Sequence, residues 1–394
     1  MRVQNVVRNK NNHLSFEIND VDASVVNALR RSIWSNVKNV AFYFDVRNMK
    51  DSDITVLKNT SPIHNEFLSQ RISMCPIHFT KDEIEQHDKL KYKFVLKKKN
   101  TTSHIVDVTT DDFTIIDTTT GETMPDSFVK RVLPRDSFTN DPIPITILKP
   151  NLTHPQNGGE VDIECYASIG TKEKHTCYSA VSNAVHWNVV DKTKADKAFE
   201  KIFNRKDASG SRMYKQSDRT TMRKEFDTLD VQRYFYTNVH GEPSRFGFSI
   251  ESECAITPDE MITIAFDYML RCLTDIEEDV QGTKSNQENM VSIAQDKTTG
   301  MTAVSIEGHS HTIGNLLQSL MYNTYLRDTV DEKHKLVYIG YNCPHPLHKQ
   351  VVLKIKFKND HDENDVKEFM IVAMKTIYEL IKEIKEDVLR SLRQ

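Results

Sequence analysis

Residues 307–320 (EGHSHTIGNLLQSL) place apolar side chains at helical spacing. Positions i, i+3, i+4, i+7 and i+8 are apolar, which predicts a short helix with one continuous apolar face. The members of this face are Ile313, Leu316, Leu317, Leu320 and Met321. Thr312 is the predicted N-cap residue. Because such a face is unfavourable in water, we expect it to pack against a partner helix.

Residues 25–34 (VVNALRRSIW) repeat this pattern and are a candidate for that partner. The correspondence pairs Asn27 with Asn315, Leu29 with Leu317 and Ile33 with Met321. Asp20 or Asp22 can cap the first of these helices. We expect both asparagines to satisfy local backbone groups. The alternative interpretation is that two common amphipathic helices are alike by chance.

Two longer amphipathic helices follow, one after each short helix. Thr257, Pro258 and Glu260 form a start signal of N-cap, first-turn proline and N3 acid. Downstream of it one face carries Met261, Ala265, Tyr268, Cys272 and Ile276. The last helix is predicted over about residues 365–390, with a heptad face of Val366, Met370, Ala373, Ile377, Leu380, Ile384 and Val388.

Each short helix is thus followed by strands and closed by a long helix. This order predicts an α+β fold in which two related modules form a pseudo-twofold pair. We expect the modules to meet through their helices. The predicted interface residues are Val25, Asn27, Leu29, Ile33, Ile313, Leu316, Leu317, Leu320, Met321, Tyr268, Cys272, Ile377, Leu380 and Ile384.

The first module is interrupted by a segment with a strand pattern. Before this segment, strands are expected over residues 5–18 and 40–46. Within it, Leu90, Tyr92, Phe94 and Leu96 alternate with lysines, as in a half-buried strand. The lysine face could bind phosphates, but solvated strand faces are commoner, and we favour that interpretation. The predicted domains are 1–50 and 166–282 (first module), 51–165 (inserted, mainly β subdomain), 283–300 (linker) and 301–394 (second module).

A basic insertion is predicted at residues 191–245 within the first module. Between residues 191 and 224 there are 11 Lys or Arg against 5 Asp or Glu. The run could contact nucleic acid or an acidic partner. A solvated insertion is the interpretation we favour.

Composition excludes several classes of protein. The chain has 38% hydrophobic and 27% charged residues and a formal net charge of −4, which does not fit a surface wholly devoted to nucleic acid. The 6 cysteines are scattered without a CxxC pair, so neither a disulfide framework nor a zinc ribbon is expected, and a reducing compartment fits best. We also expect no signal peptide and no membrane span.

Cys343, His345 and His348 could be mistaken for zinc ligands, as could His309 and His311. Zinc needs three or four converging ligands, and no second pair has suitable spacing, so we predict no metal. A hydrolase that uses this loop is an open alternative, although no GxSxG nucleophile motif is present.

Several motifs resemble the α-like subunits of multisubunit DNA-directed RNA polymerases. The second module resembles the small α-like (eleventh) subunit type through HTIGNLL at 311–317, IGYNCPHPL at 339–347 and the long final helix. The first module resembles the large α-like (third-largest) type. Its matching stretches are VVNALRRSIW (25–34), NEFLSQRISMCPI (65–77), IPITILKP (143–150), GTKEKHTCYSAVSNAV (170–185) and FSIESECAITPDE (248–260).

The resemblance implies a non-catalytic assembly platform without a cofactor. In cellular enzymes the two subunits are separate polypeptides, whereas here they look fused, as in polymerases of large nucleocytoplasmic DNA viruses. The implied location is the host cytoplasm, in viral factories, and the virion. The implied partners are the second-largest and largest subunits and small zinc-binding subunits, with DNA or RNA reached only through the complex, no membrane and no homo-oligomer. A stand-alone nucleic-acid-binding protein that uses the basic insertion is the alternative.

The resemblance also implies particular contacts. Arg30 and Arg31 stand where the second module has Gln318 and Ser319, so the arginine pair is expected to face a large subunit. Glu66, Arg71 and His175 are the other expected contacts with large subunits. Pro344, His345 and Pro346 form an expected structural loop in which His345 bonds to a neighbouring strand or subunit. Some large α-like subunits carry a cysteine cluster, but no cysteine lies between Cys75 and Cys165, so we predict no iron–sulfur site.

Overall fold

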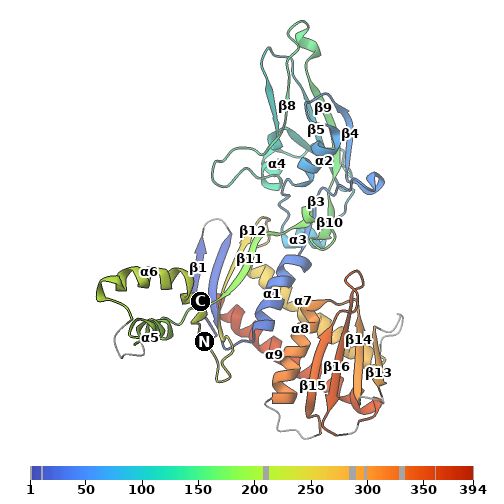
Figure 1. The fold of residues 1–394 in the computed structure, drawn as a ribbon. Coiled ribbons are helices and arrows are strands. Elements are labelled where there is room, and N and C mark those ends of the chain that lie inside the picture. The colour runs from blue at the N-terminus through green and yellow to red at the C-terminus, as the bar shows by residue number, and fades with distance from the viewer. Residues whose placement is uncertain are drawn as a thin grey trace.

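The computed structural model describes residues 2–9, 12–206, 213–283, 290–296, 300–327, 333–359 and 361–393. It has the predicted α+β class, with helices and several antiparallel sheets. Three parts are distinguishable in Figure 1: a central first module, an inserted subdomain above it and a second module at the lower right. The N- and C-termini lie together beside the first module (Figure 1).

The first module contains an antiparallel sheet in the order β1-β2-β12-β11. Its strands are β1 (Val3–Asn9), β2 (His13–Asn19), β12 (Arg245–Ser252) and β11 (Val181–Asn188). Its helices are α1 (Ala23–Asn36) and α7 (Pro258–Gln281). The prediction of one strand over 5–18 is wrong, because the backbone turns back and pairs β1 with β2. Only β2 has the alternating burial of a half-buried strand, whereas most of β1 is exposed.

The inserted subdomain contains a second sheet in the order β4-β9-β5-β7 and a separate pair, β6 with β8. The strands are β4 (Ile54–Asn59), β9 (Glu160–Tyr166), β5 (Tyr92–Lys99), β7 (Phe113–Asp117), β6 (Val106–Thr109) and β8 (Pro144–Leu148). The helices are α2 (Asn65–Ser73), α3 (Lys81–Glu85) and α4 (Asp126–Val132), with short turns η1 (Met49–Asp51), η2 (Thr110–Asp112) and η3 (Pro155–Asn157).

A narrow stem joins this subdomain to the first module. In it β3 (Lys38–Ala41) pairs with β10 (Ser168–Thr171), followed by η4 (Thr176–Tyr178). The strand expected over 40–46 therefore ends at Ala41. Beyond it, the Tyr43 amide donates to the Asp53 carboxylate at 2.9 Å instead of joining a sheet.

The lysine face of β5 is a ladder of ion pairs. Lys93 contacts Glu164 at 2.8 Å and Lys97 contacts Asp162 at 2.7 Å, both across to β9. Lys58 on β4 likewise contacts Glu160 on β9 at 2.8 Å. The acids of β9 thus neutralise these lysines, which favours the structural interpretation over a phosphate-binding ladder.

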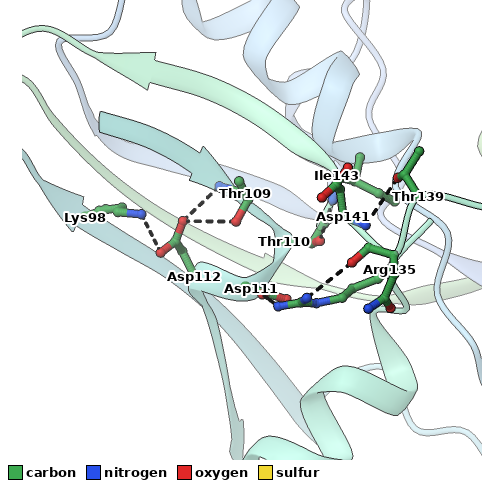
Figure 2. Close-up of polar contacts among 10 residues, drawn as sticks. Lys98, Thr109, Thr110, Asp111, Asp112, Arg135, Thr139, Asp141 and Ile143 are labelled. Atoms are coloured by element: carbon green, nitrogen blue, oxygen red, sulfur yellow. Dashed lines mark hydrogen bonds and ion pairs between the residues drawn. The ribbon is translucent and has the colours of Figure 1, made fainter. Parts of the chain in front are cut away.

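The turn between β6 and β7 contacts residues 133–143, which join α4 to β8 and include Pro134 and Pro142. Figure 2 shows the Asp112 carboxylate accepting from Lys98 Nζ at 2.7 Å and from the Thr109 amide at 2.8 Å. Thr110 and Ile143 exchange two hydrogen bonds, and Arg135 pairs with Asp111 (Figure 2). These contacts therefore hold in place a segment that forms no helix or strand of its own.

The basic insertion folds around an aromatic core of its own. It consists of α5 (Lys192–Phe203), η5 (Gln216–Asp218), α6 (Arg219–Leu229) and η6 (Val231–Arg233). Phe199, Phe203 and Phe226 are buried in a cluster separate from the main core. Arg223 pairs with Asp196 at 2.7 Å, which leaves less positive charge free than the composition implied.

The second module has a sheet in the order β13-β14-β16-β15. Its strands are β13 (Val291–Asp296), β14 (Met301–Glu307), β16 (Gln350–Phe357) and β15 (Leu336–Asn342). Its helices are α8 (His311–Met321), the π-helical turn η7 (Tyr322–Arg327) and α9 (Glu363–Leu392).

Residues 283–300 are only partly a linker. The prediction of a linker is wrong for Val291–Asp296, which pair with β14 as an edge strand. The remaining interior positions, 284–289 and 297–299, lie outside the described residues. The segment was missed because an edge strand that is half exposed carries little apolar patterning.

Among the described residues, no helix is both long and apolar enough to cross a membrane.

Candidate functional site

The two modules meet where the short helices α1 and α8 pack against each other. The long helices α7 and α9 also pack together, and α1 contacts α7 (Figure 1). One continuous buried cluster runs through all four helices. The helix pairing predicted from the repeated pattern is therefore present.

Most of the predicted interface residues are buried. Those with less than a tenth of their surface exposed are Val25, Leu29, Ile33, Cys272, Ile313, Leu316, Leu317, Leu320, Met321, Ile377 and Ile384. Asn27, Tyr268 and Leu380 are half-buried. On α9 the fully buried face includes Ile381, at i+4 from Ile377, which leaves Leu380 at the edge of the stripe.

Asp22 joins the modules through its carboxylate. It is the N-cap of α1 and accepts from the Ser24 amide at 2.7 Å. Asp22 is one of the two caps predicted for this helix, and Asp20 is the other. The same carboxylate accepts from Ser319 Oγ at 3.0 Å and from Asn323 Nδ2 at 2.9 Å, both in the second module. A single carboxylate thus caps one helix and fixes the end of the other.

Arg31 makes the second polar contact between the short helices. Its Nε donates to Thr312 Oγ1 at 2.7 Å. The prediction that Thr312 is an N-cap is wrong, because α8 begins at His311 and Ser310 occupies the cap position. The Thr312 hydroxyl therefore serves the interface between the modules.

Two ion pairs extend the contact on either side of the helices. Arg327 NH1 contacts Glu242 at 2.9 Å, and Lys349 Nζ contacts Glu173 at 2.8 Å. Neither pair was predicted, because each joins loops or turns that are distant in sequence and carry no local pattern.

Arg30 and Arg31 lie half-buried on α1. Arg30 donates to the Asn27 side-chain oxygen from Nε at 3.2 Å and from NH2 at 2.9 Å. The prediction that Asn27 satisfies a local backbone group is therefore wrong, and no such bond is present for Asn315 among the described residues. Burial, together with the neighbouring Arg31 cation, lowers the pKa of Arg30.

The other residues expected to contact large subunits lie apart from this pair. Glu66 and Arg71 are exposed on α2 in the inserted subdomain, where Arg71 NH2 donates to the Pro144 carbonyl at 2.9 Å (Figure 1). His175 lies in the stem and caps η4, accepting from the Cys177 amide at 3.2 Å. The structure therefore distributes the five residues over three surfaces.

Residues 344–349 of the loop are exposed, and Cys343 before them is half-buried. His345 Nδ1 accepts from the Leu347 amide at 3.2 Å, between Pro344 and Pro346. The expected bond from His345 to a neighbouring strand is thus not present, because the ring closes its own turn. The alternative bond to a neighbouring subunit stays a prediction. Cys343 Sγ lies 3.6 Å from His311 Nδ1, yet the described residues contain no group of three or more His, Cys, Asp or Glu suited to a metal ion.

Gly314 is required by the close approach of α8 to its own sheet. A Cβ there would lie 2.6 Å from Tyr341 Cδ2 and 3.0 Å from Val351 Cγ1. We expect Gly314→Ala to lower the free energy of unfolding by about 1–3 kcal/mol, because overpacking outweighs the gain in helix propensity. Denaturant titration of both proteins measures it.

Gln318→Ala, on a half-buried position of the same helix, is the control and should change stability by no more than about 0.5 kcal/mol. An alanine at 314 that leaves stability unchanged would show that Tyr341 moves aside at no cost.

Comparison with known proteins assigns both modules. Residues 15–273 match the RNA polymerase Rpb3/Rpb11 dimerisation domain, and residues 302–387 match a second version of that domain. Because the first match covers more than half of the 394 residues, the chain belongs to this family and is an α-like RNA polymerase subunit.

Two relatives are similar over long stretches. The DNA-directed RNA polymerases I and III subunit rpac1 of Dictyostelium discoideum is 26% identical over 314 residues, which are 70% of this chain and 81% of the relative. The DNA-directed RNA polymerases IV and V subunit 3B of Arabidopsis thaliana is 25% identical over 190 residues, 45% of this chain and 54% of the relative.

Proposed function

We propose that the protein is a non-catalytic assembly platform of a DNA-directed RNA polymerase, in which a large and a small α-like subunit are fused. One observation carries this proposal: α1, in the first matched domain, packs against α8, in the second, within a single polypeptide. Because each dimerisation domain already has its partner in the same polypeptide, the surface that the two domains form together remains available to other subunits.

The partner we propose for this surface is the second-largest subunit. Arg30 and Arg31 support this because a guanidinium engaged at one edge retains N–H groups for a partner carboxylate. Their half-buried position on α1 limits the rotamer entropy that binding would cost. The largest subunit and small zinc-binding subunits complete the proposed set of partners.

Purification of the tagged protein from its native source tests the proposal. We expect the two largest polymerase subunits to co-purify with it. Arg30→Glu should reduce the recovered second-largest subunit, whereas Arg233→Glu, on a side chain that is 77% exposed in the basic insertion, should not. Recovery of the wild-type protein without any large polymerase subunit would contradict the proposal.

We also propose that the source is a large nucleocytoplasmic DNA virus and that the protein acts in cytoplasmic viral factories and is packaged in the virion. The presence of two dimerisation domains in one polypeptide supports this origin. Fractionation of infected cells and purified particles, followed by detection of the protein, tests it. A purely nuclear protein would contradict the proposed location.

A further inference from the structure

A cavity of about 390 Å³ lies between α7 and the inserted subdomain. Its walls come from α7, from α3, from the end of α1 and from the stem strands β3 and β10. Figure 1 shows α3 beside β3 and β10, above α1 and α7. The cavity therefore lies where the subdomain joins the first module, and no described residue of the second module lines it.

Four isoleucines form its apolar lining. Ile84 and Ile256 are buried, while Ile169 and Ile264 are half-buried. Tyr268, predicted as an interface residue, is half-buried and also lines the cavity. An apolar lining of this size can enclose one or two apolar side chains of a bound segment.

The charges at the cavity are not balanced. Of the two lining acids, Glu85 contacts Lys81 at 3.9 Å, and Asp267 pairs with Lys385 of α9. Lys38 and Arg271 are exposed lining cations, and neither forms an ion pair within the described residues. Two uncompensated cations beside an apolar lining are complementary to an apolar group that carries a carboxylate nearby.

We propose that this cavity binds a segment of a partner protein in which an apolar side chain lies next to an Asp, a Glu or a C-terminal carboxylate. The apolar group contacts the isoleucines, and the carboxylate pairs with Lys38 and Arg271. The inference rests on the proposed function, because another polymerase subunit supplies the segment. It adds a contact separate from Arg30 and Arg31.

Photo-crosslinking in the assembled complex tests the inference. Tyr268→p-benzoylphenylalanine places an aromatic ketone in the cavity, and mass spectrometry identifies the partner peptide. We expect one main crosslinked segment, with an acidic residue or a C-terminal carboxylate within a few positions. The same crosslinker at Leu229, which is 72% exposed on α6, should not label that segment.

Charge reversal supplies the second arm. Lys38→Glu combined with Arg271→Glu should reduce the crosslink by about tenfold, since two ion pairs are replaced by repulsion. Lys192→Glu combined with Lys197→Glu, two exposed lysines of α5, changes the net charge equally and should leave the crosslink intact.

Three outcomes would overturn the inference. They are a crosslinked segment without acids, a yield that charge reversal does not change, and capture of a small molecule or of no partner while the large subunits still co-purify. Each leaves the proposed function standing. Complete absence of polymerase subunits would contradict the proposed function and the inference together.

Discussion

Replacing Leu317 with alanine is expected to lower the free energy of unfolding by about 2–5 kcal/mol, the usual cost of a cavity left by a buried leucine. Leu317 is 0% exposed on α8, the helix that packs against α1. The interior there is close-packed, so its neighbours can close the cavity only in part. Denaturant titration followed by circular dichroism measures the change.

Leu347→Ala is the matched control. Leu347 is 86% exposed in the loop of the same module, so its truncation should change stability by no more than about 0.5 kcal/mol. We also expect Leu29→Ala and Leu317→Ala to be coupled by about 0.5–3 kcal/mol, because the two helices share one core. Strictly additive effects would contradict a common interface.

Asp53→Ala should destabilise the stem of the inserted subdomain by about 2–4 kcal/mol, because it removes the acceptor of two part-buried hydrogen bonds and leaves their donors unpaired. Asp53 is 4% exposed and also pairs with Lys89, whose side chain is 47% exposed. Its carboxylate accepts from the Tyr43 amide at 2.9 Å and from Ser168 Oγ, so it joins the outgoing and returning segments of the backbone. Stability and hydrogen exchange at the Tyr43 amide report the loss.

Asp162→Ala distinguishes this effect from the loss of any Asp–Lys pair. Asp162 pairs at 2.7 Å with Lys97, whose side chain is 66% exposed, and we expect a cost of at most about 1 kcal/mol. If Asp162→Ala lost as much stability as Asp53→Ala, the burial of Asp53 would not explain the size of its effect.

Helices were predictable because their signals are local. The 3.6-residue period on α1, α7, α8 and α9 directly indicated which faces are buried. The Thr257 capping box, with its Glu260 partner, is present as predicted.

Contacts between distant residues were not predictable. Arg31 and Thr312 are 281 positions apart, and Asp22 and Asn323 are 301 apart. Nothing in the local sequence distinguishes these side chains from solvated ones. The ion pairs between the β9 acids and the β5 lysines were unpredictable for the same reason, because they depend on the register in which the two strands pair.

Cleavage between the modules tests the central claim most directly. A site for a sequence-specific protease can replace part of residues 284–289, which lie outside the described residues. We predict that after cleavage the two halves remain a 1:1 complex in native mass spectrometry, because α1 with α8 and α7 with α9 hold them together. Folded halves that separate at micromolar concentration would contradict the account.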